Sequence, residues 1–133
     1  MESWVESEVL GPKYWSGKFE HDIESVFLEQ DRLIVLVNTK NEAGEDAALK
    51  VSFEWIVAFR FMDEANMTYY ANLPLITSTF HVYKILSGGW SNGEVRQQGI
   101  LDASAGVYSE YLVATNNGCI QILSGDTPKI DWN

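Results

Sequence analysis

The sequence predicts an α+β fold, in which a twisted antiparallel sheet of six or seven strands packs on one or two helices. Three patterns indicate this. Apolar and polar residues alternate from Lys50 to Met62, which is the side-chain period of a β-strand. Two strand-like runs, Glu110 to Thr115 and Cys119 to Leu123, flank an Asn-Gly pair typical of a tight hairpin. Asp63 to Leu73 has helical spacing after a capping residue.

The chain has 133 residues, so residues 1–133 are predicted to form a single domain with one core. No segment has the roughly 18 consecutive apolar residues that a membrane-spanning helix needs. The N-terminus lacks the basic start and long apolar run of a secretory signal. Cys119 is the only cysteine, which excludes an intramolecular disulfide. These features predict a cytoplasmic protein.

The first third of the chain contains short strand-like runs separated by polar residues. Met1 to Leu10 fits either a short helix or a loosely docked arm, whereas Tyr14 to Glu20 has the aromatic residues of a strand. Ser25 to Leu28 and Arg32 to Asn38 are predicted to form two strands joined by a turn. The polar run Thr39 to Ala47 predicts a flexible loop.

The segment from Lys50 to Met62 is predicted to be the central strand of the sheet. Its odd-numbered positions are all apolar, so one face of the strand would be wholly apolar. Burial of these side chains would contribute roughly 1.5–3 kcal/mol each before conformational entropy is subtracted. They are Val51, Phe53, Trp55, Val57, Phe59 and Phe61.

The second half begins with the predicted helix, which Pro74 prevents from continuing far. Thr77 to Leu86 is β-branched and aromatic and is predicted to be a strand. Ser87 to Gly93 has the residues of a turn, and Glu94 to Val107 has no clean period and is predicted to be a long connection. Gly125 to Asn133 is predicted to be a tail whose apolar residues fix it to the body of the protein.

Charge is the outlying property of the composition. Lys and Arg number 9 and Asp and Glu number 19, which gives a net charge of −10. The first 64 residues contain 14 of these acids and only 6 of the bases. This field repels phosphate backbones and anionic membrane surfaces, so neither nucleic acid nor a membrane is a predicted partner. A basic protein would be attracted, although acidity that only keeps the chain soluble remains the alternative.

Residues that could carry catalysis are few. Cys119 could act as a nucleophile with His21 or His81 as its base, but Cys119 follows the hairpin glycine and begins a strand, which favours an inert buried thiol. Two separated histidines and one cysteine do not have metal-ligand spacing. No glycine-rich phosphate-binding motif occurs. The sequence therefore predicts no catalytic residues, no metal site and no cofactor.

An acidic, aromatic surface in the first half is the strongest candidate for a binding site. Carboxylates at turns are solvated and can meet the Lys and Arg of a partner, while aromatic side chains would supply affinity. A merely solvated face is the alternative interpretation. The predicted partner-binding residues are the anchors Tyr14, Trp15 and Trp90 and the carboxylates of Glu20, Asp22, Glu24, Glu29, Asp31, Glu42, Glu45 and Asp46.

Three segments together resemble a known group of proteins. They are FEWIVAFRFMDE (Phe53 to Glu64), SGGW (Ser87 to Trp90) and EYLVATNNGCIQIL (Glu110 to Leu123). The set resembles small bacterial proteins that include immunity proteins of polymorphic and contact-dependent growth inhibition toxin systems. The resemblance implies a small acidic α+β protein that binds a basic nuclease-type toxin domain and blocks its active site.

The leading hypothesis is therefore a non-enzymatic, cytoplasmic, immunity-type inhibitor of a cognate and basic toxin domain. One alternative is a self-associating structural or adaptor protein, such as a homodimer formed through exposed edge strands. Another is a small-molecule-binding domain or enzyme lined by Trp55, Tyr83 and Trp90.

Overall fold

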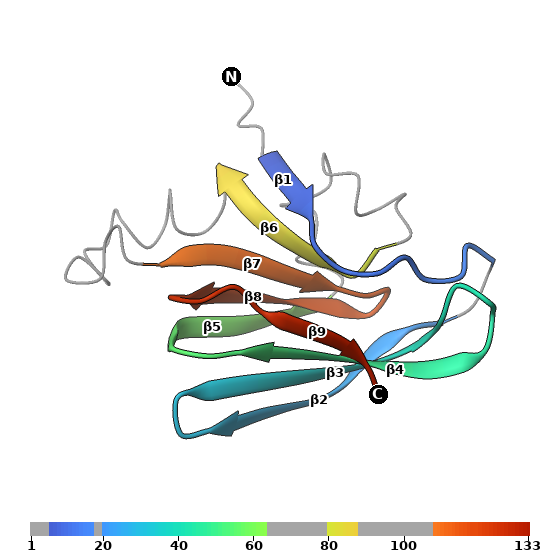
Figure 1. Cartoon of the computed structure of the whole chain (residues 1–133), viewed down its shortest axis with the longest axis horizontal. Helices are drawn as coiled ribbons and strands as arrows, with labels where there is room; N and C mark the ends of the chain where they lie inside the picture. The colour runs from blue at the N-terminus through green and yellow to red at the C-terminus, as the bar shows by residue number, and fades with distance from the viewer. Residues whose placement is uncertain (1–5, 18–19, 64–79, 88–107) are drawn as a thin grey trace.

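The computed structural model describes residues 6–17, 20–63, 80–87 and 108–133. These residues form two antiparallel sheets, with strand orders β1-β6-β7-β8-β5 and β2-β3-β4-β9 (Figure 1). The strands are β1 (Glu6–Val9), β2 (Asp22–Glu29), β3 (Arg32–Lys40), β4 (Asp46–Phe53), β5 (Ile56–Asp63), β6 (Val82–Ser87), β7 (Ser109–Ala114), β8 (Gly118–Ser124) and β9 (Lys129–Trp132).

The four-stranded sheet is built from two consecutive hairpins. The pair Glu29↔Arg32 closes the β2–β3 hairpin around a two-residue loop, in which Gln30 has a positive φ of 55°. A positive φ at the first loop position is the feature of a type II′ turn. β3 then pairs with β4 without a register shift, and β9 adds to the other side of β4. The strands predicted at Ser25 to Leu28 and Arg32 to Asn38 are thereby confirmed.

The five-stranded sheet contains the predicted C-terminal hairpin, which is confirmed as β7 and β8. The Thr115 N–H donates to the carbonyl of Gly118 at 2.9 Å and closes the turn. The Asn-Gly pair is expected to adopt the positive φ angles of a tight hairpin turn, but the φ angle of Gly118 is not positive. A Cβ atom at Gly118 would lie 2.7 Å from both the Phe61 ring and the Met62 carbonyl oxygen. The glycine is therefore needed for close approach of β5.

The main core lies between the two sheets. Alternate residues of β3 and β4 point inward, including Leu33, Val35 and Val51, and all are fully buried. Facing them are Val113 of β7 and Ile122 of β8. Each sheet covers the apolar face of the other, which is the reason that a sandwich forms.

The opposite face of the five-stranded sheet is buried as well. Tyr83, Leu112 and Cys119 have no exposed surface and form a second apolar cluster. Gln121 shares this face and accepts a hydrogen bond from Arg60 of the neighbouring strand β5. Strands β7 and β8 are consequently enclosed on both sides, unlike any strand of the four-stranded sheet.

The predicted α+β class is wrong for the part of the chain that the structure describes. None of these residues is helical, and nine strands replace the six or seven expected. Asp63, the expected helix cap, is the last residue of β5, and the rest of the predicted helix lies outside the described residues. The apolar face of each sheet is covered by the other sheet instead of by a helix.

The single central strand predicted from Lys50 to Met62 is also wrong. Glu54 and Trp55 form a turn, and the two halves of the segment belong to different sheets. Trp55 has a positive φ of 48°, is 54% exposed, and accepts a hydrogen bond at its carbonyl from the Gly125 N–H at 2.9 Å. No glycine, proline or asparagine marks this turn, and the alternation of apolar and polar residues continues through it. The sequence pattern therefore does not reveal the turn.

The remaining expectations concern the ends of the chain. Residues 6–9 of the N-terminal segment, predicted as helix or arm, form edge strand β1, and the predicted C-terminal tail contains β9. The strand expected from Tyr14 to Glu20 is wrong in its described residues, since only the adjacent Lys13 makes an isolated bridge, to Phe80. The described ranges hold no helix with the length and apolar character needed to cross a membrane.

Candidate protein-binding surface

The predicted carboxylates lie on one sheet, the four-stranded one, and gather at its two ends. Glu20, Asp22 and Glu24 lie at the start of β2, opposite the end of β3. Glu29 and Asp31 lie at the β2–β3 turn, at the other end of the same hairpin. Apart from the half-buried Asp22, these side chains are exposed. Together with the three acids of the β3–β4 loop they form what we call the acidic surface.

The β3–β4 loop carries Glu42 and Glu45 and leads into Asp46, all three of which are exposed. This loop was predicted to be flexible, but Asn41 organises it. The Asn41 side-chain oxygen accepts from the N–H groups of Ala43 at 3.0 Å and Glu45 at 3.1 Å. Asn41 also donates from its amide nitrogen to the Glu45 carboxylate at 3.2 Å. Such an Asx-type turn orders the backbone of the loop and ties down the side chain of Glu45.

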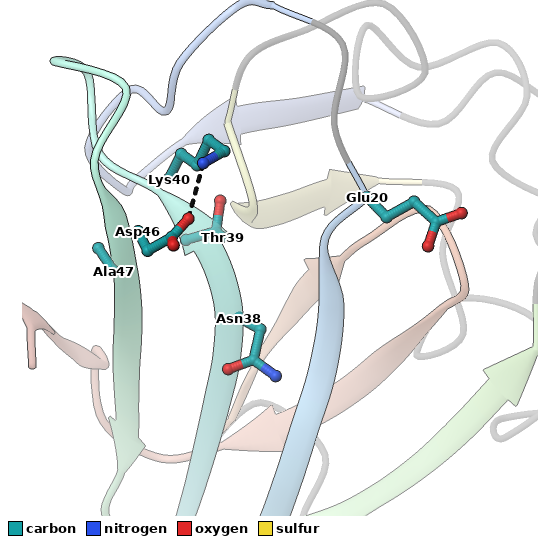
Figure 2. Close-up of a pocket in the computed structure, with 6 residues that line it drawn as sticks. All are labelled: Glu20, Asn38, Thr39, Lys40, Asp46 and Ala47. Carbon is teal, nitrogen blue, oxygen red and sulfur yellow. Dashed lines mark hydrogen bonds and ion pairs between the residues drawn. The ribbon is translucent and has the colours of Figure 1, made fainter.

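A shallow cavity of about 260 Å³ lies beside this loop (Figure 2). Its lining is Glu20, Asn38, Thr39, Lys40, Asp46 and Ala47, and Figure 2 shows the ion pair between Lys40 and Asp46 spanning two adjacent strands. The Nζ–Oδ1 distance is 2.6 Å, and the hydrogen bond and charge of Lys40 hold the pKa of Asp46 below its ordinary value. The cavity is smaller and more polar than most small-molecule sites.

Of the predicted anchors, Trp15 lies beside the acidic loop. Its backbone N–H donates to the Lys40 carbonyl at 3.3 Å, and its indole nitrogen lies 3.4 Å from the position that a Cβ of Gly44 would occupy. The side chain is 36% exposed, so Trp15 is both fixed and accessible. Trp90 lies outside the described residues.

Tyr14 is not an exposed anchor. Its ring stacks on His81 with 4.2 Å between ring centroids and lies 5.0 Å from His21, while the two imidazoles meet edge to face at 4.7 Å. We call these three residues the imidazole cluster. No local pattern connects residues so far apart in the chain, so sequence analysis treats the two histidines separately.

Hydrogen bonds determine the tautomer of His81. Its Nδ1 donates to the Ala114 carbonyl oxygen at 2.8 Å, so Nδ1 carries the proton and Nε2 accepts from the Thr39 hydroxyl at 2.8 Å. His21 instead pairs with the β7–β8 turn. The backbone N–H of His21 donates to the Asn116 side-chain oxygen at 3.0 Å. The ring Nδ1 of His21 accepts from the backbone N–H of Asn116 at 3.2 Å.

The imidazole cluster is a neutral junction between the two sheets. Burial lowers the pKa of His81 to about 4, helped by the neighbouring His21 and opposed by the bond to Ala114. Burial also lowers the pKa of His21 to about 4, against the opposing effect of the Asp22 charge. Neutral imidazoles with satisfied hydrogen bonds are stable in an interior, and the cluster fixes the start of β2 against the β7–β8 hairpin.

Cys119 has the properties of a structural thiol. It is fully buried in the second apolar cluster, and burial raises its pKa to about 12 despite the opposing charge of Arg60. A thiol with this pKa is protonated at neutral pH and is a poor nucleophile. The two histidines considered as its base are occupied in the imidazole cluster, where their pKa values are also unsuited to accepting a proton at pH 7.

An exposed apolar patch on β2 was missed by sequence analysis. Val26, Phe27 and Leu28 are 37%, 50% and 58% exposed. The sequence predicts a strand here but not the exposure of its side chains, because sequence pattern does not distinguish an edge strand from a central one. We call these three residues the β2 edge patch. Glu29 follows the patch directly, and Glu24 precedes it by two residues.

The alternative small-molecule site is not assembled by the described residues. Trp55 lies exposed on the turn between β4 and β5, whereas Tyr83 is fully buried on the outer face of the five-stranded sheet and donates to the Phe80 carbonyl at 3.0 Å. Within the described ranges, no three His, Cys, Asp or Glu side chains are arranged to hold a metal ion. Comparison with protein-family models, curated proteins and solved structures found no match to this chain.

Proposed function

We propose that this protein is a non-enzymatic, immunity-type inhibitor that works in the cytoplasm. It binds a basic protein, a nuclease-like toxin domain, through the acidic surface of its four-stranded sheet. Three observations support the proposal. Most carboxylates of that surface are exposed, Trp15 lies accessible beside them, and three segments resemble immunity proteins.

The observation that carries the proposal is that most carboxylates of the acidic surface have no Lys or Arg partner among the residues that the structure describes. Eight carboxylates make up the acidic surface, and among the described residues only Asp46 forms an ion pair, with Lys40. Glu45 accepts one hydrogen bond from a neutral amide. Acids retained only for internal stability would be expected to pair with Lys or Arg of the same chain.

Unpaired surface carboxylates favour association with a basic partner in two ways. Their summed field accelerates encounter, and it disfavours partners of like charge. Because they remain in water until the partner arrives, they impose no burial cost on the free protein. A nuclease domain has a cationic surface that normally contacts phosphates, so a cluster of carboxylates can occupy the same cations and exclude the substrate.

The proposal expects a basic toxin domain to be encoded beside this chain, and the test is whether this protein binds that domain and rescues cells from it. Co-expression with that domain should restore growth, and the purified proteins should associate with a rate constant that falls on the order of tenfold or more between about 0.05 M and 0.5 M salt. A variant that carries Glu24→Gln, Glu29→Gln and Asp31→Asn should lose a similar factor at low salt.

A matched control removes the same number of charges elsewhere. Glu6, Glu8 and Asp126 are exposed and lie outside the acidic surface. The variant with Glu6→Gln, Glu8→Gln and Asp126→Asn should keep the association rate within about twofold of the parent protein. Equal losses in both variants, or association that is insensitive to salt, would contradict the proposal.

A further inference from the structure

β2 ends the four-stranded sheet, and no further described strand pairs with its outer edge. Figure 1 shows β2 along the lower margin of the molecule, with β3 on its inner side. An unpaired edge offers a row of backbone N–H and C=O groups to another extended chain. This edge also carries three consecutive exposed apolar side chains, Val26, Phe27 and Leu28. Natural edge strands usually avoid that combination.

The turn determines which backbone groups face outward. In a two-residue hairpin the residues that flank the loop, here Glu29 and Arg32, form a hydrogen-bonded pair. Hydrogen-bonded and non-hydrogen-bonded pairs alternate along an antiparallel ladder. Phe27↔Ile34 is therefore also hydrogen-bonded, while Val26↔Val35 and Leu28↔Leu33 are not. The amides of Val26 and Leu28 thus point away from β3, toward the open edge.

The side chains of Val26 and Leu28 share the inward face of the sheet with Val35 and Leu33 of β3. They nevertheless remain exposed, because nothing described continues the sheet past β2. The apolar core between the sheets is therefore left open to solvent along β2, at Val26 and Leu28.

The facing sheet is uncovered on the same margin. Its last strand, β5, starts beside the β2–β3 turn, where the Ile56 N–H donates to the Asp31 carbonyl at 3.1 Å. Phe59 and Phe61 of β5 pair with Ile122 and Ile120 and share their inward face. They are still 38% and 59% exposed. A strand added to β2 would extend the smaller sheet and could cover these two rings.

Charge selects what kind of chain can occupy this edge. Between Asp22 and Arg32 the hairpin has four acids and a single base, and no ion pair within the described part of the chain involves any of them. A second copy paired antiparallel about Phe27 would bring Glu24 and Glu29 of both copies to one ladder, in molecules that each carry a net charge of −10. An extended segment with Lys or Arg beside an apolar centre would meet opposite charges instead.

We infer that β2 is the docking edge for an extended basic segment of the protein partner, which adds as a strand and places alternate apolar side chains over Val26, Leu28 and the β5 rings. The inference rests on the proposed function, since it names the element of the basic partner that the acidic surface receives. Backbone hydrogen bonds provide binding energy, and the flanking carboxylates select the charge.

The test uses synthetic peptides with blocked ends and the whole protein chain. The probe KRVTVTVKR has an alternating apolar centre with basic ends. It should bind with an affinity that falls at least about tenfold from low to high salt. Two controls have the same length. EEVTVTVEE reverses the end charges, and KRVTPTVKR removes one backbone donor and breaks the extended pairing. Both should bind at least about tenfold more weakly than the probe.

Amide hydrogen exchange reports whether a strand forms. The amides of Val26 and Leu28 should exchange rapidly in the free protein and slow at least about tenfold when the probe is bound, whereas the amides of Phe27 and Glu29 should be protected in both states. Binding without new protection at Val26 and Leu28 would overturn the inference while leaving the charge-based function standing. The same holds if the peptide does not bind but the neighbouring toxin domain does.

A backbone variant tests the same edge. Val26→Pro removes an amide that points outward, a position at which edge strands accept proline. It should weaken probe binding at least about fivefold, while Val26→Thr, which keeps the amide, should not. Retained protection of β7 and β8 amides will show that each variant is folded. A homodimer in sedimentation that protects Val26 and Leu28 before the probe is added would also overturn the inference.

Discussion

Strands β8 and β2 have similar sequences but opposite surroundings. β8 contains the run CIQIL and β2 contains SVFLE, and both mix β-branched or aliphatic residues with one or two polar ones. Every residue of β8 is buried, whereas β2 is largely exposed beyond its first residues. The cause is position in the sheet: β8 lies between β7 and β5, whereas β2 has only one neighbour, β3, among the described strands.

This difference shows that an apolar run predicts a strand better than it predicts burial. On β8 the apolar side chains serve the core, and replacing them should cost stability. On β2 the same residue types gain little from folding, because about half of their surface stays in water. Exposed apolar side chains in a row are explained more readily by a partner than by the stability of this chain.

The largest expected effect is on the free energy of unfolding, when a buried side chain of β8 is shortened and compared with an exposed side chain of β2. Ile122→Ala in β8 should lower the free energy of unfolding by about 2–5 kcal/mol, because Ile122 is fully buried between the sheets. Leu28→Ala in β2 should cost less than about 1 kcal/mol, because Leu28 is mostly exposed. Urea denaturation of both variants measures the contrast. Similar losses would mean that β2 is part of the core.

The second prediction concerns the imidazole cluster, where β2 is joined to the hairpin that contains β8. Burial depresses the folded-state pKa of His81 from 6.5 to about 4. Between these two pH values the unfolded chain binds the proton and the folded protein does not, so stability is full above pH 6.5 and falls as the pH drops toward 4. The loss attributable to His81 is on the order of 3 kcal/mol, and His21 acts in the same direction.

The measurement is urea denaturation at several pH values between 7 and 4, with His81→Gln as the comparison. A glutamine amide can donate toward the Ala114 carbonyl and accept from the Thr39 hydroxyl, but it does not titrate. The variant should therefore show a flatter dependence of stability on pH, whatever its stability at neutral pH. Parallel curves for the parent and the variant would refute a buried neutral His81.

The sequence predicted local structure more reliably than tertiary arrangement. β2, β3 and the β7–β8 hairpin were predicted from β-branched runs and from Asn117-Gly118, since these signals act within a few residues. Asp31, Glu42 and Glu45 lie in turns as expected, whereas Asp22 and Glu24 lie within β2. The fold class was predicted wrongly and the strand break at Trp55 was not predicted, because alternation is insensitive to which sheet a strand joins.

In the candidate site, too, local sequence signals do not reveal which residues come together in the folded chain. Trp15 lies beside the acidic loop, but Tyr14, next to it in sequence, turns inward onto His81. No local pattern separates these two aromatic residues. The contact between His21 and Asn116 joins residues 95 positions apart, so only the folded chain reveals it. The β2 edge patch was equally invisible, because exposure at a sheet edge depends on the order of strands.

The smallest expected change in the free energy of unfolding concerns the turns of the two hairpins. The β7–β8 turn already has the favoured residues Asn117 and Gly118, whereas the β2–β3 turn places Gln30 at a φ of 55°. A side chain with a Cβ is disfavoured at this angle, and a type II′ turn favours glycine at this position. Gln30→Gly should therefore raise the free energy of unfolding by about 0.5–1 kcal/mol, since Gln30 is exposed and loses no packing. Gln30→Val should lower it, because a β-branched side chain is poorly compatible with positive φ. If the two substitutions had the same sign in urea denaturation, the positive φ of Gln30 would not limit the stability of this turn.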